Sequence, residues 1–181
     1  MTEQSIVYGK IDQAYRSGLD IDDLLSIQDD DFQDMDSLIK ITHDTAQSFI
    51  AESTFISRPT FGLEISYLVG GADADLIIDQ TLIDIKVNSR LSFESYPWHQ
   101  LLTYYILGQL TPGYSTPISR LAIWNPRYDV MMYMEIQDVM QLLTFDTFVG
   151  EFIRTLEHIH AEHGDVPMTL RYLDQIKNLW K

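Results

Sequence analysis

The sequence predicts an α/β protein in which a mixed central sheet is flanked by helices. Apolar residues recur at helical spacing near both ends of the chain, and short apolar or alternating runs typical of strands lie between them. A helix separates two groups of these strands, which implies a crossover and therefore a mixed sheet. With 181 residues the chain is long enough for one well-packed core, and we expect one domain over residues 1–181.

Two helices are expected before the first strand. Their predicted ranges are Ser5–Ile27, where the helical spacing is loose, and about Asp34–Ala51, where the apolar residues fall on one face. The acidic segment Gln28–Asp34 separates them and supplies a helix start.

Three strands joined by short turns are expected next. The first, Thr60–Val69, alternates, with Phe61, Leu63, Ile65 and Tyr67 on one side. The other two are predicted at Ala72–Ile78 and Thr81–Val87, and the turns at Gly70-Gly71 and Asp79-Gln80. Strands connected in this way form a meander.

The second half of the chain combines helices with one further strand pair. A helix is expected over Tyr96–Leu110, because apolar residues recur along it and Thr111-Pro112-Gly113 ends it. The remaining predicted elements are strands at Ile118–Trp124 and Val130–Ile136, joined at Asn125-Pro126-Arg127, a long helix over Asp138–His160 and a short helix over about Met168–Trp180.

The composition limits the location of the protein. The chain has no cysteine, which excludes disulfides and thiolate metal sites and fits a reducing compartment. The N-terminal residues show neither the basic nor the apolar region of a signal peptide, and no apolar run is long enough to span a membrane. We therefore expect a cytoplasmic protein without a membrane partner.

The net charge of −15 disfavours a nucleic-acid partner, because phosphate binding normally needs a basic face. The charge is unevenly distributed: residues 1–50 hold eleven acids and three bases, whereas residues 51–128 hold seven acids and five bases. A divalent cation bound in the central region would bring that region close to neutral. The acidic excess lies mostly in the terminal segments, where it marks a surface for a protein partner. Nothing in the sequence selects a phosphate contact among the other central bases, Arg58, Arg90, Arg120 and Arg127.

Charged residues are embedded in two of the predicted strands. Asp75 directly precedes the apolar run 76–78, and Asp84 and Lys86 lie in the apolar run 82–87. Charges in buried strands need partners, and strand alternation puts Asp84 and Lys86 on one face. The alternative for Lys86 is a lysine at the strand edge whose ammonium reaches water. Two carboxylates and an ammonium on one patch are typical of a metal site for phosphodiester hydrolysis.

Three motifs follow one another along this part of the chain: Asp75 before the run 76–78, then Asp84-Ile85-Lys86, then Gln100-x-x-x-Tyr104 on the next predicted helix. In these motifs the chain resembles the PD-(D/E)XK nuclease superfamily, and specifically its RecB-like branch. The resemblance implies a restriction-endonuclease-like αβββαβ core over about residues 34–136, with accessory helices in 1–33 and 137–181. It also implies a Mg²⁺-dependent deoxyribonuclease in which Mn²⁺ would substitute.

The resemblance also assigns roles to the motif residues. Asp75 and Asp84 would hold the metal together with the backbone carbonyl of Ile85, since Mg²⁺ prefers oxygen ligands. Lys86 would contact the attacking water and the phosphate. On the helix, Gln100 would support the metal cluster and Tyr104 would lie near the nucleic acid.

The remaining ligands stay open. Asp73 shares a face with Asp75 by strand alternation, but its side chain can equally satisfy the Gly70-Gly71 turn. The family places a histidine or acid on the helix before the first strand, for which we favour His43 and then Glu52, with Glu64 as a further contributor. A lone histidine near an apolar face is more often a core residue. The three histidines His158, His160 and His163 have metal-like spacing, but we expect them to be solvated at a helix end.

The favoured hypothesis is a metal-dependent nuclease that hydrolyses DNA, with RNA as an alternative substrate. Because the domain is small and acidic, we expect it to work within a larger assembly or as an oligomer, in a phage, recombination or defence setting by family analogy. The competing hypothesis is a catalytically silent or weak nuclease fold that serves as an acidic protein-binding module or DNA mimic. The intact set Asp75, Asp84 and Lys86 favours the enzyme.

Overall fold

A five-stranded mixed sheet forms the centre of the computed structural model, which describes residues 2–18, 27–58, 60–69, 71–90, 94–111, 117–163 and 166–179. The strands follow one another across the sheet as β1 (Ile56–Ser57), β2 (Leu76–Ile78), β3 (Thr81–Ile85), β4 (Arg120–Asn125) and β5 (Val130–Glu135). Only β3 and β4 pair in parallel; the other neighbours are antiparallel. Parallel pairing needs a crossover, which helix α5 (Ser95–Leu110) supplies. The α/β class with a mixed sheet is therefore confirmed.

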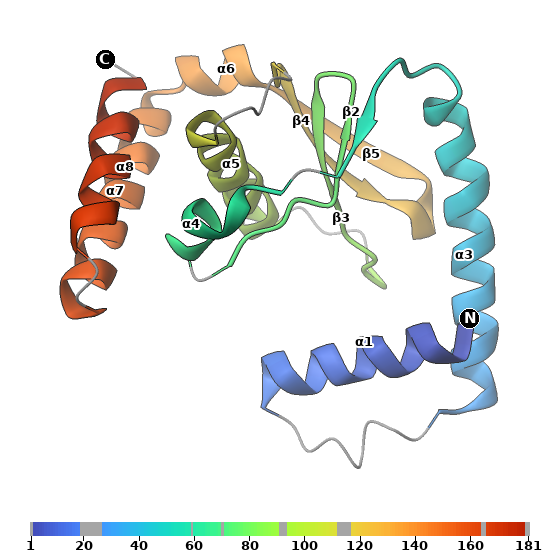
Figure 1. Cartoon of the computed structure of the whole chain (residues 1–181). Helices are drawn as coiled ribbons and strands as arrows, with labels where there is room; N and C mark the ends of the chain where they lie inside the picture. Colours follow the sequence, from blue (N-terminus) through green and yellow to red (C-terminus); the bar gives the residue numbers. More distant parts are fainter. Residues whose placement is uncertain are drawn as a thin grey trace.

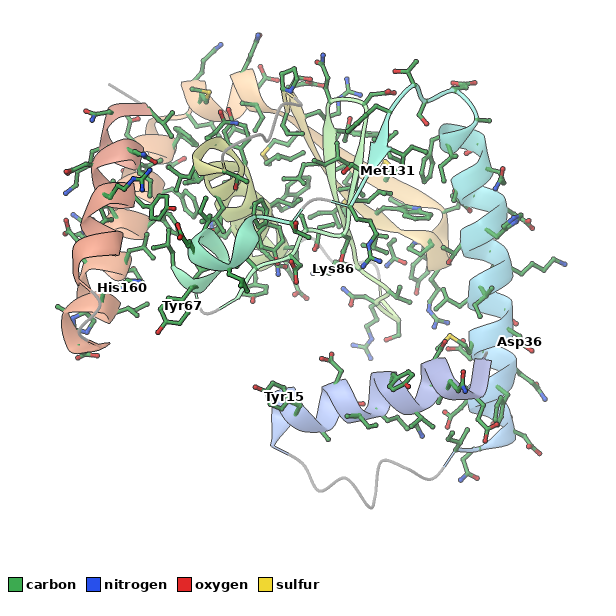
Figure 2. The ribbon with its side chains drawn as sticks, in the orientation of Figure 1. Tyr15, Asp36, Tyr67, Lys86, Met131 and His160 are labelled. Atoms are coloured by element: carbon green, nitrogen blue, oxygen red, sulfur yellow. The ribbon has the colours of Figure 1, made fainter. Side chains whose placement is uncertain are left out.

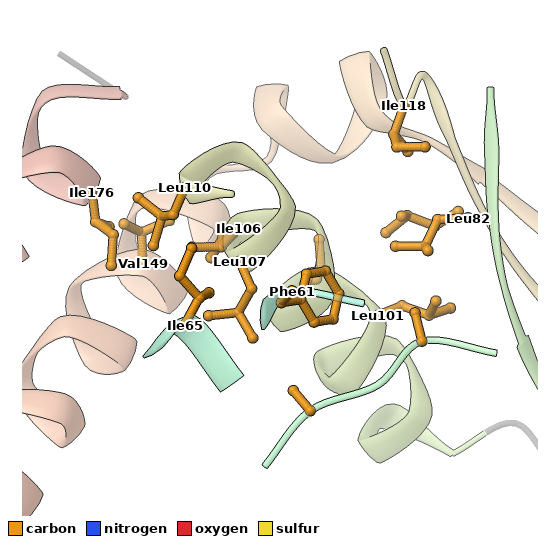
Figure 3. Close-up of a cluster of buried hydrophobic side chains, with 14 of the residues drawn as sticks. Phe61, Ile65, Leu82, Leu101, Ile106, Leu107, Leu110, Ile118, Val149 and Ile176 are labelled. Atoms are coloured by element: carbon orange, nitrogen blue, oxygen red, sulfur yellow. The ribbon is translucent and has the colours of Figure 1, made fainter. Parts of the chain in front are cut away.

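Two helices cover opposite faces of this sheet (Figure 1). On one face, α5 packs against β3 and β4 through a large apolar core that includes Leu82, Leu101 and Ile106 (Figure 3). On the other face, helix α3 (Asp29–Ile50) brings Phe49 edge-on to Trp124, with 5.0 Å between the ring centroids. Side chains alternate along β3 and β4, so consecutive residues join the two different layers.

The remaining helices extend the molecule on both sides. At the N-terminal side, α1 (Thr2–Ser17) contacts α3, where Lys10 pairs with Asp31 at 3.0 Å. At the C-terminal side, α6 (Ile136–Gln141) leads to α7 (Leu143–His163) and α8 (Val166–Leu179), which pack together. Helix α8 contacts α5. No helix in the described part of the chain is long and apolar enough to cross a membrane.

The prediction of a strand over Thr60–Val69 was wrong, because most of this segment forms helix α4 (Gly62–Tyr67). Its buried residues are Phe61, Ile65 and Leu68, which have helical spacing, whereas Leu63 is 92 % exposed. The alternating apolar pattern therefore does not describe the buried face. The first strand of the sheet is instead the short β1, which lies before α4 and still pairs with β2.

Other predicted boundaries shift or break. The single helix expected over Asp138–His160 is two helices, α6 and α7, because the backbone at Leu142 is extended. This break allows both Val139 and Phe145 to be buried. The helix expected over Tyr96–Leu110 is confirmed as α5. The helix expected over Ser5–Ile27 is described as α1 up to Ser17, and residues 19–26 lie outside the described part, as do Gly70 and Pro112-Gly113.

Candidate functional site

A buried ion pair lies where β3 ends, on the sheet face that α5 covers. Asp84 is only 3 % exposed, and its Oδ1 accepts a hydrogen bond from Lys86 Nζ at 3.0 Å. The same ammonium lies 2.8 Å from Asp84 Oδ2. Figure 2 shows Lys86 at this end of the sheet. The side chain of Lys86 is thus held by a buried carboxylate, although 27 % of it remains exposed.

Helix α5 extends this ion pair into a chain of polar contacts. Lys86 Nζ donates to Gln100 Oε1 at 3.0 Å, and Gln100 Nε2 donates to Tyr104 Oη at 2.7 Å. Residues four apart on a helix lie one above the other, so Gln100 and Tyr104 both face β3. The Tyr104 ring also packs against Phe61, with 5.6 Å between the centroids. The structure therefore brings Asp84, Lys86, Gln100 and Tyr104 together.

Asp75 joins the site through the backbone of β3. Its Oδ2 accepts a hydrogen bond from the Ile85 amide at 2.7 Å. Strand β2 begins only at Leu76, so Ile85 has no residue of β2 paired with it, and the carboxylate takes that place. The N–H and C=O of one strand residue point toward the same neighbouring strand, so the Ile85 carbonyl faces the edge where Asp75 lies. Two carboxylates and one carbonyl thus converge beside Lys86.

The carboxylates and the tyrosine influence one another electrostatically. Burial raises the pKa of Asp84 above the ordinary carboxyl value, the Lys86 ammonium opposes this change, and the nearby charge of Asp75 adds to it. Burial likewise raises the pKa of Tyr104, and the charges of Asp84 and Asp75 raise it further. Tyr104 therefore stays a neutral hydroxyl that can donate or accept a hydrogen bond next to both carboxylates.

The donor set fits a magnesium ion that keeps most of its water ligands. Asp84 Oδ2 is buried, and the Lys86 ammonium lies 2.8 Å from it. A buried carboxylate oxygen can bind a hard cation, and Mg²⁺ is commonly held by one or two carboxylates with waters and substrate phosphate. No group of three or more His, Cys, Asp or Glu residues gathers around a common point in the described ranges. The site therefore offers Asp75, Asp84 and the Ile85 carbonyl.

Asp73 lies close to the site in sequence but makes none of the contacts described above. Ala72 and Ala74 are buried, and Asp73 and Asp75 are exposed on the other side of the chain, as alternation predicts. The backbone of Asp73 forms an isolated antiparallel bridge with Thr60. Its partner in the expected turn, Gly70, lies outside the described residues.

The sequence favours His43 and then Glu52 as the ligand from the helix before the first strand, but the structure brings neither residue to the site. His43 lies on α3, which packs on the opposite face of the sheet, and its exposed ring is 3.3 Å from Asp44 Oδ1. Glu52 lines a wide surface pocket at the start of β3, which Thr81 also lines, and about 10 Å of strand separates Thr81 from Asp84. Glu64 lies on α4, where its carboxylate accepts a hydrogen bond from Tyr172 at 2.8 Å.

The C-terminal histidines also differ from the prediction in one case. His158 is exposed, as expected, but His160 is buried and its Nε2 lies 3.4 Å from the Leu68 carbonyl. The helix α7 continues through His163, so His160 is not at a solvated end. It packs between α7 and α4 and belongs to the core rather than to the site.

Sequence reasoning missed the polar residues that surround Lys86. A cavity of about 20 Å³, large enough for roughly one water molecule, touches Lys86, Arg90 and Trp98. The buried Asn125 side chain links the segments that follow β3 and β4, with its Nδ2 3.4 Å from the Asn88 carbonyl and its Oδ1 accepting from the Arg127 amide at 3.1 Å. No local sequence pattern identifies these residues, because β4 pairing brings them together.

Two of the four central arginines already have carboxylate partners. Arg127 pairs with Asp34 of α3 through two hydrogen bonds of 2.7 and 2.8 Å, and Arg120 donates to Glu135 at 2.6 Å. Arg90 forms no ion pair within the described ranges and lies beside Lys86. Among these arginines, Arg90 is therefore the one best placed to meet a phosphate at the site.

Comparison of the chain with protein-family models, with curated proteins and with solved structures finds no match. The resemblance to PD-(D/E)XK nucleases therefore rests on the motif residues alone.

Proposed function

We propose that the chain is a divalent-metal-dependent nuclease with a RecB-like PD-(D/E)XK core that hydrolyses DNA phosphodiester bonds. One observation carries this proposal: the buried carboxylate of Asp84 lies next to a second carboxylate, Asp75, and the Lys86 ammonium. The strand order, with β3 and β4 parallel and α5 as the crossover, supports an αβββαβ core in which α4 is inserted between the first two strands. Mg²⁺ is the metal that these oxygen ligands favour, and Mn²⁺ accepts the same ligands.

In this proposal each residue of the site has a defined role. Asp75 and Asp84 hold the cation with the Ile85 carbonyl, and a bound cation lowers the pKa of water and offsets charge on the phosphate. Lys86 orients the attacking water and donates a hydrogen bond to a phosphate oxygen. Gln100 fixes the direction of the Lys86 ammonium through its 3.0 Å contact, and Tyr104 fixes Gln100. The polar chain thus positions the ammonium before substrate binds.

A cleavage assay with purified protein tests the proposal. Single-stranded and double-stranded DNA, and RNA, are incubated with Mg²⁺, Mn²⁺ or EDTA, using end-labelled and circular forms. We expect DNA cleavage that requires the metal and falls at least about 100-fold in Lys86→Met, the range for losing one acid–base group. Lys177→Met is the matched control, because this lysine pairs with Glu157 on the distant pair α7 and α8. Absence of metal-dependent cleavage on every substrate contradicts the proposal.

The second candidate function is protein binding through the N-terminal helices, and an exposed apolar stripe favours it. Tyr8, Ile11 and Tyr15 recur at helical spacing on α1, and Tyr15 is 89 % exposed. Figure 2 shows Tyr15 near the end of α1, away from the sheet. If no nucleic acid is cleaved and no divalent cation binds Asp75 and Asp84, this function is the one that remains.

A further inference from the structure

A second cavity lies on the far side of Trp98 from the candidate site. It has a volume of about 250 Å³, is open to solvent, and is lined by the start of α5, the end of β5 and the helices α6 and α7. The side chains that matter for its chemistry are Ser95, Trp98, His99, Met134, Phe145 and Phe148. None of these residues takes part in the polar chain around Lys86.

The walls of this cavity suit a flat aromatic ligand. His99 and Phe148 stack on one another with their centroids 5.5 Å apart and an angle of 25° between the rings. Trp98 and Phe145 are buried and form a fixed apolar floor, whereas Ser95 and Thr144 are exposed and bring hydroxyl groups to the opening. Aromatic walls with a few polar groups at the mouth are the usual composition of a small-ligand site.

The cavity and the candidate active site share one lining side chain. Trp98 lines both this cavity and the small cavity that is also lined by Lys86, Arg90 and Glu94. A charged cavity with two bases and one acid and an aromatic cavity therefore lie on either side of the Trp98 indole. A nucleotide has two parts that complement them, an anionic phosphate and a flat base.

The charge of the protein gives a physical reason for such a cavity. A chain with a net charge of −15 gains little from long-range attraction to phosphate. Stacking of a base on an aromatic side chain does not depend on net charge and contributes substantially for each base. An unpaired base can enter a cavity freely, whereas a base in a duplex must first lose its pairing and stacking.

We propose that this cavity binds one nucleobase of a single-stranded DNA, next to the phosphate that is cleaved. The proposal rests on the nuclease function for the position of that phosphate, but base binding itself does not require catalysis. The base packs against the outer face of the stacked His99–Phe148 pair, its polar edge faces the hydroxyl groups of Ser95 and Thr144, and Trp98 separates it from Lys86. The substrate class is therefore single-stranded DNA, with a base required at one position.

A binding measurement in EDTA tests the cavity without catalysis. Deoxyadenosine monophosphate and 2-deoxyribose 5-phosphate are titrated separately, and the ring C–H signals of His99, assigned by their loss in His99→Ala, are followed by NMR. We expect the nucleotide to shift these signals and the sugar phosphate to leave them in place. Phe148→Leu keeps an apolar side chain without the ring, and it should weaken nucleotide binding about tenfold. Equal responses to both ligands would overturn the proposal.

Phe152→Leu is the matched control, since Phe152 is also half-buried on α7 but does not line the cavity. It should bind the nucleotide as the parent does, and both variants are checked for the parent's circular dichroism spectrum. If Phe152→Leu weakens binding as much as Phe148→Leu, the effect comes from general loosening of α7 and the cavity is not the site.

A cleavage measurement separates this proposal from the nuclease proposal. Single-stranded oligonucleotides with one abasic position are compared under single-turnover conditions, and we expect one abasic position near the cut to slow cleavage about tenfold in the parent but not in Phe148→Leu. If DNA is cleaved with no sensitivity to abasic positions, the base site is refuted and the nuclease stands. If DNA is not cleaved but nucleotide binding depends on Phe148, the nuclease proposal fails and the base site is supported.

Discussion

Replacing Lys86 by methionine tests how the buried Asp84 carboxylate is stabilised. Methionine keeps an unbranched apolar side chain in place of the lysine stem and removes the ammonium. Asp84 is 3 % exposed, so it would lose its charged partner without gaining access to water. We expect the free energy of unfolding to fall and metal-dependent cleavage to be lost.

The size of the effect follows from burial. Removing one partner of a fully buried ion pair costs about 3–5 kcal/mol. The Lys86 side chain is 27 % exposed, so water already screens part of the interaction, and we expect a loss of about 2 kcal/mol at pH 7 in EDTA. For a chain of this length that corresponds to a decrease of about 6 °C in Tm.

The pH dependence has a defined sign. Burial raises the pKa of folded Asp84 above its unfolded value, so the folded state binds a proton more tightly and the ionised carboxylate reduces stability as pH rises. The cost of Lys86→Met should therefore be largest at neutral pH and shrink as pH falls and Asp84 is protonated. A double variant with Asp84→Asn should regain most of the lost stability while staying inactive.

Urea unfolding in EDTA at several pH values measures these effects, with Lys177→Met as the control. Lys177 is a surface residue whose ion pair with Glu157 is worth less than about 1 kcal/mol. If Lys86→Met unfolds at the same urea concentration as the parent at pH 7, or if the double variant is no more stable than the single one, the buried-charge argument is wrong.

Three other substitutions test separate parts of the structure. His43→Ala should leave the rate of DNA cleavage unchanged, because α3 packs on the face opposite the site. A decrease in this rate of more than about tenfold would show that His43 does act at the site. Gly62→Ala should lower stability by about 1 kcal/mol in thermal unfolding, because Gly62 has a φ of +75°. The Arg127 guanidinium lowers the pKa of Asp34, so Asp34→Asn should destabilise at neutral pH, and unfolding followed against pH should show the difference disappearing as Asp34 is protonated in acid.

The parts of the site that follow short-range rules could be predicted from the sequence. Alternation along one strand put Asp84 and Lys86 on the same face, and helical spacing put Gln100 and Tyr104 one turn apart. The turn at Asp79-Gln80 fixed the register of β2 on β3, which brought Asp75 beside Ile85. These relations depend on residues within one hairpin or one helix.

The parts that failed depend on contacts far apart in the sequence. The resemblance favours His43 because the family places a histidine or acid on the helix before the first strand, but α3 packs on the other face of the sheet, where Phe49 contacts Trp124. The segment Thr60–Val69 contains apolar residues at both strand and helix spacing, and only packing against α5 selects the helix. Local pattern alone cannot make either choice.

The presence of Asp84 and Lys86 on this strand is difficult to explain by stability. Their neighbours Leu82 and Ile83 are fully buried apolar residues, and an apolar pair in place of the two charges would be neutral or stabilising in most proteins. Buried groups that reduce stability are concentrated at functional sites, because their perturbed chemistry is what the site uses. The same reasoning applies to Asp75. Its carboxylate accepts the hydrogen bond of the Ile85 amide in place of a strand partner, and this contact brings a second negative charge toward Asp84.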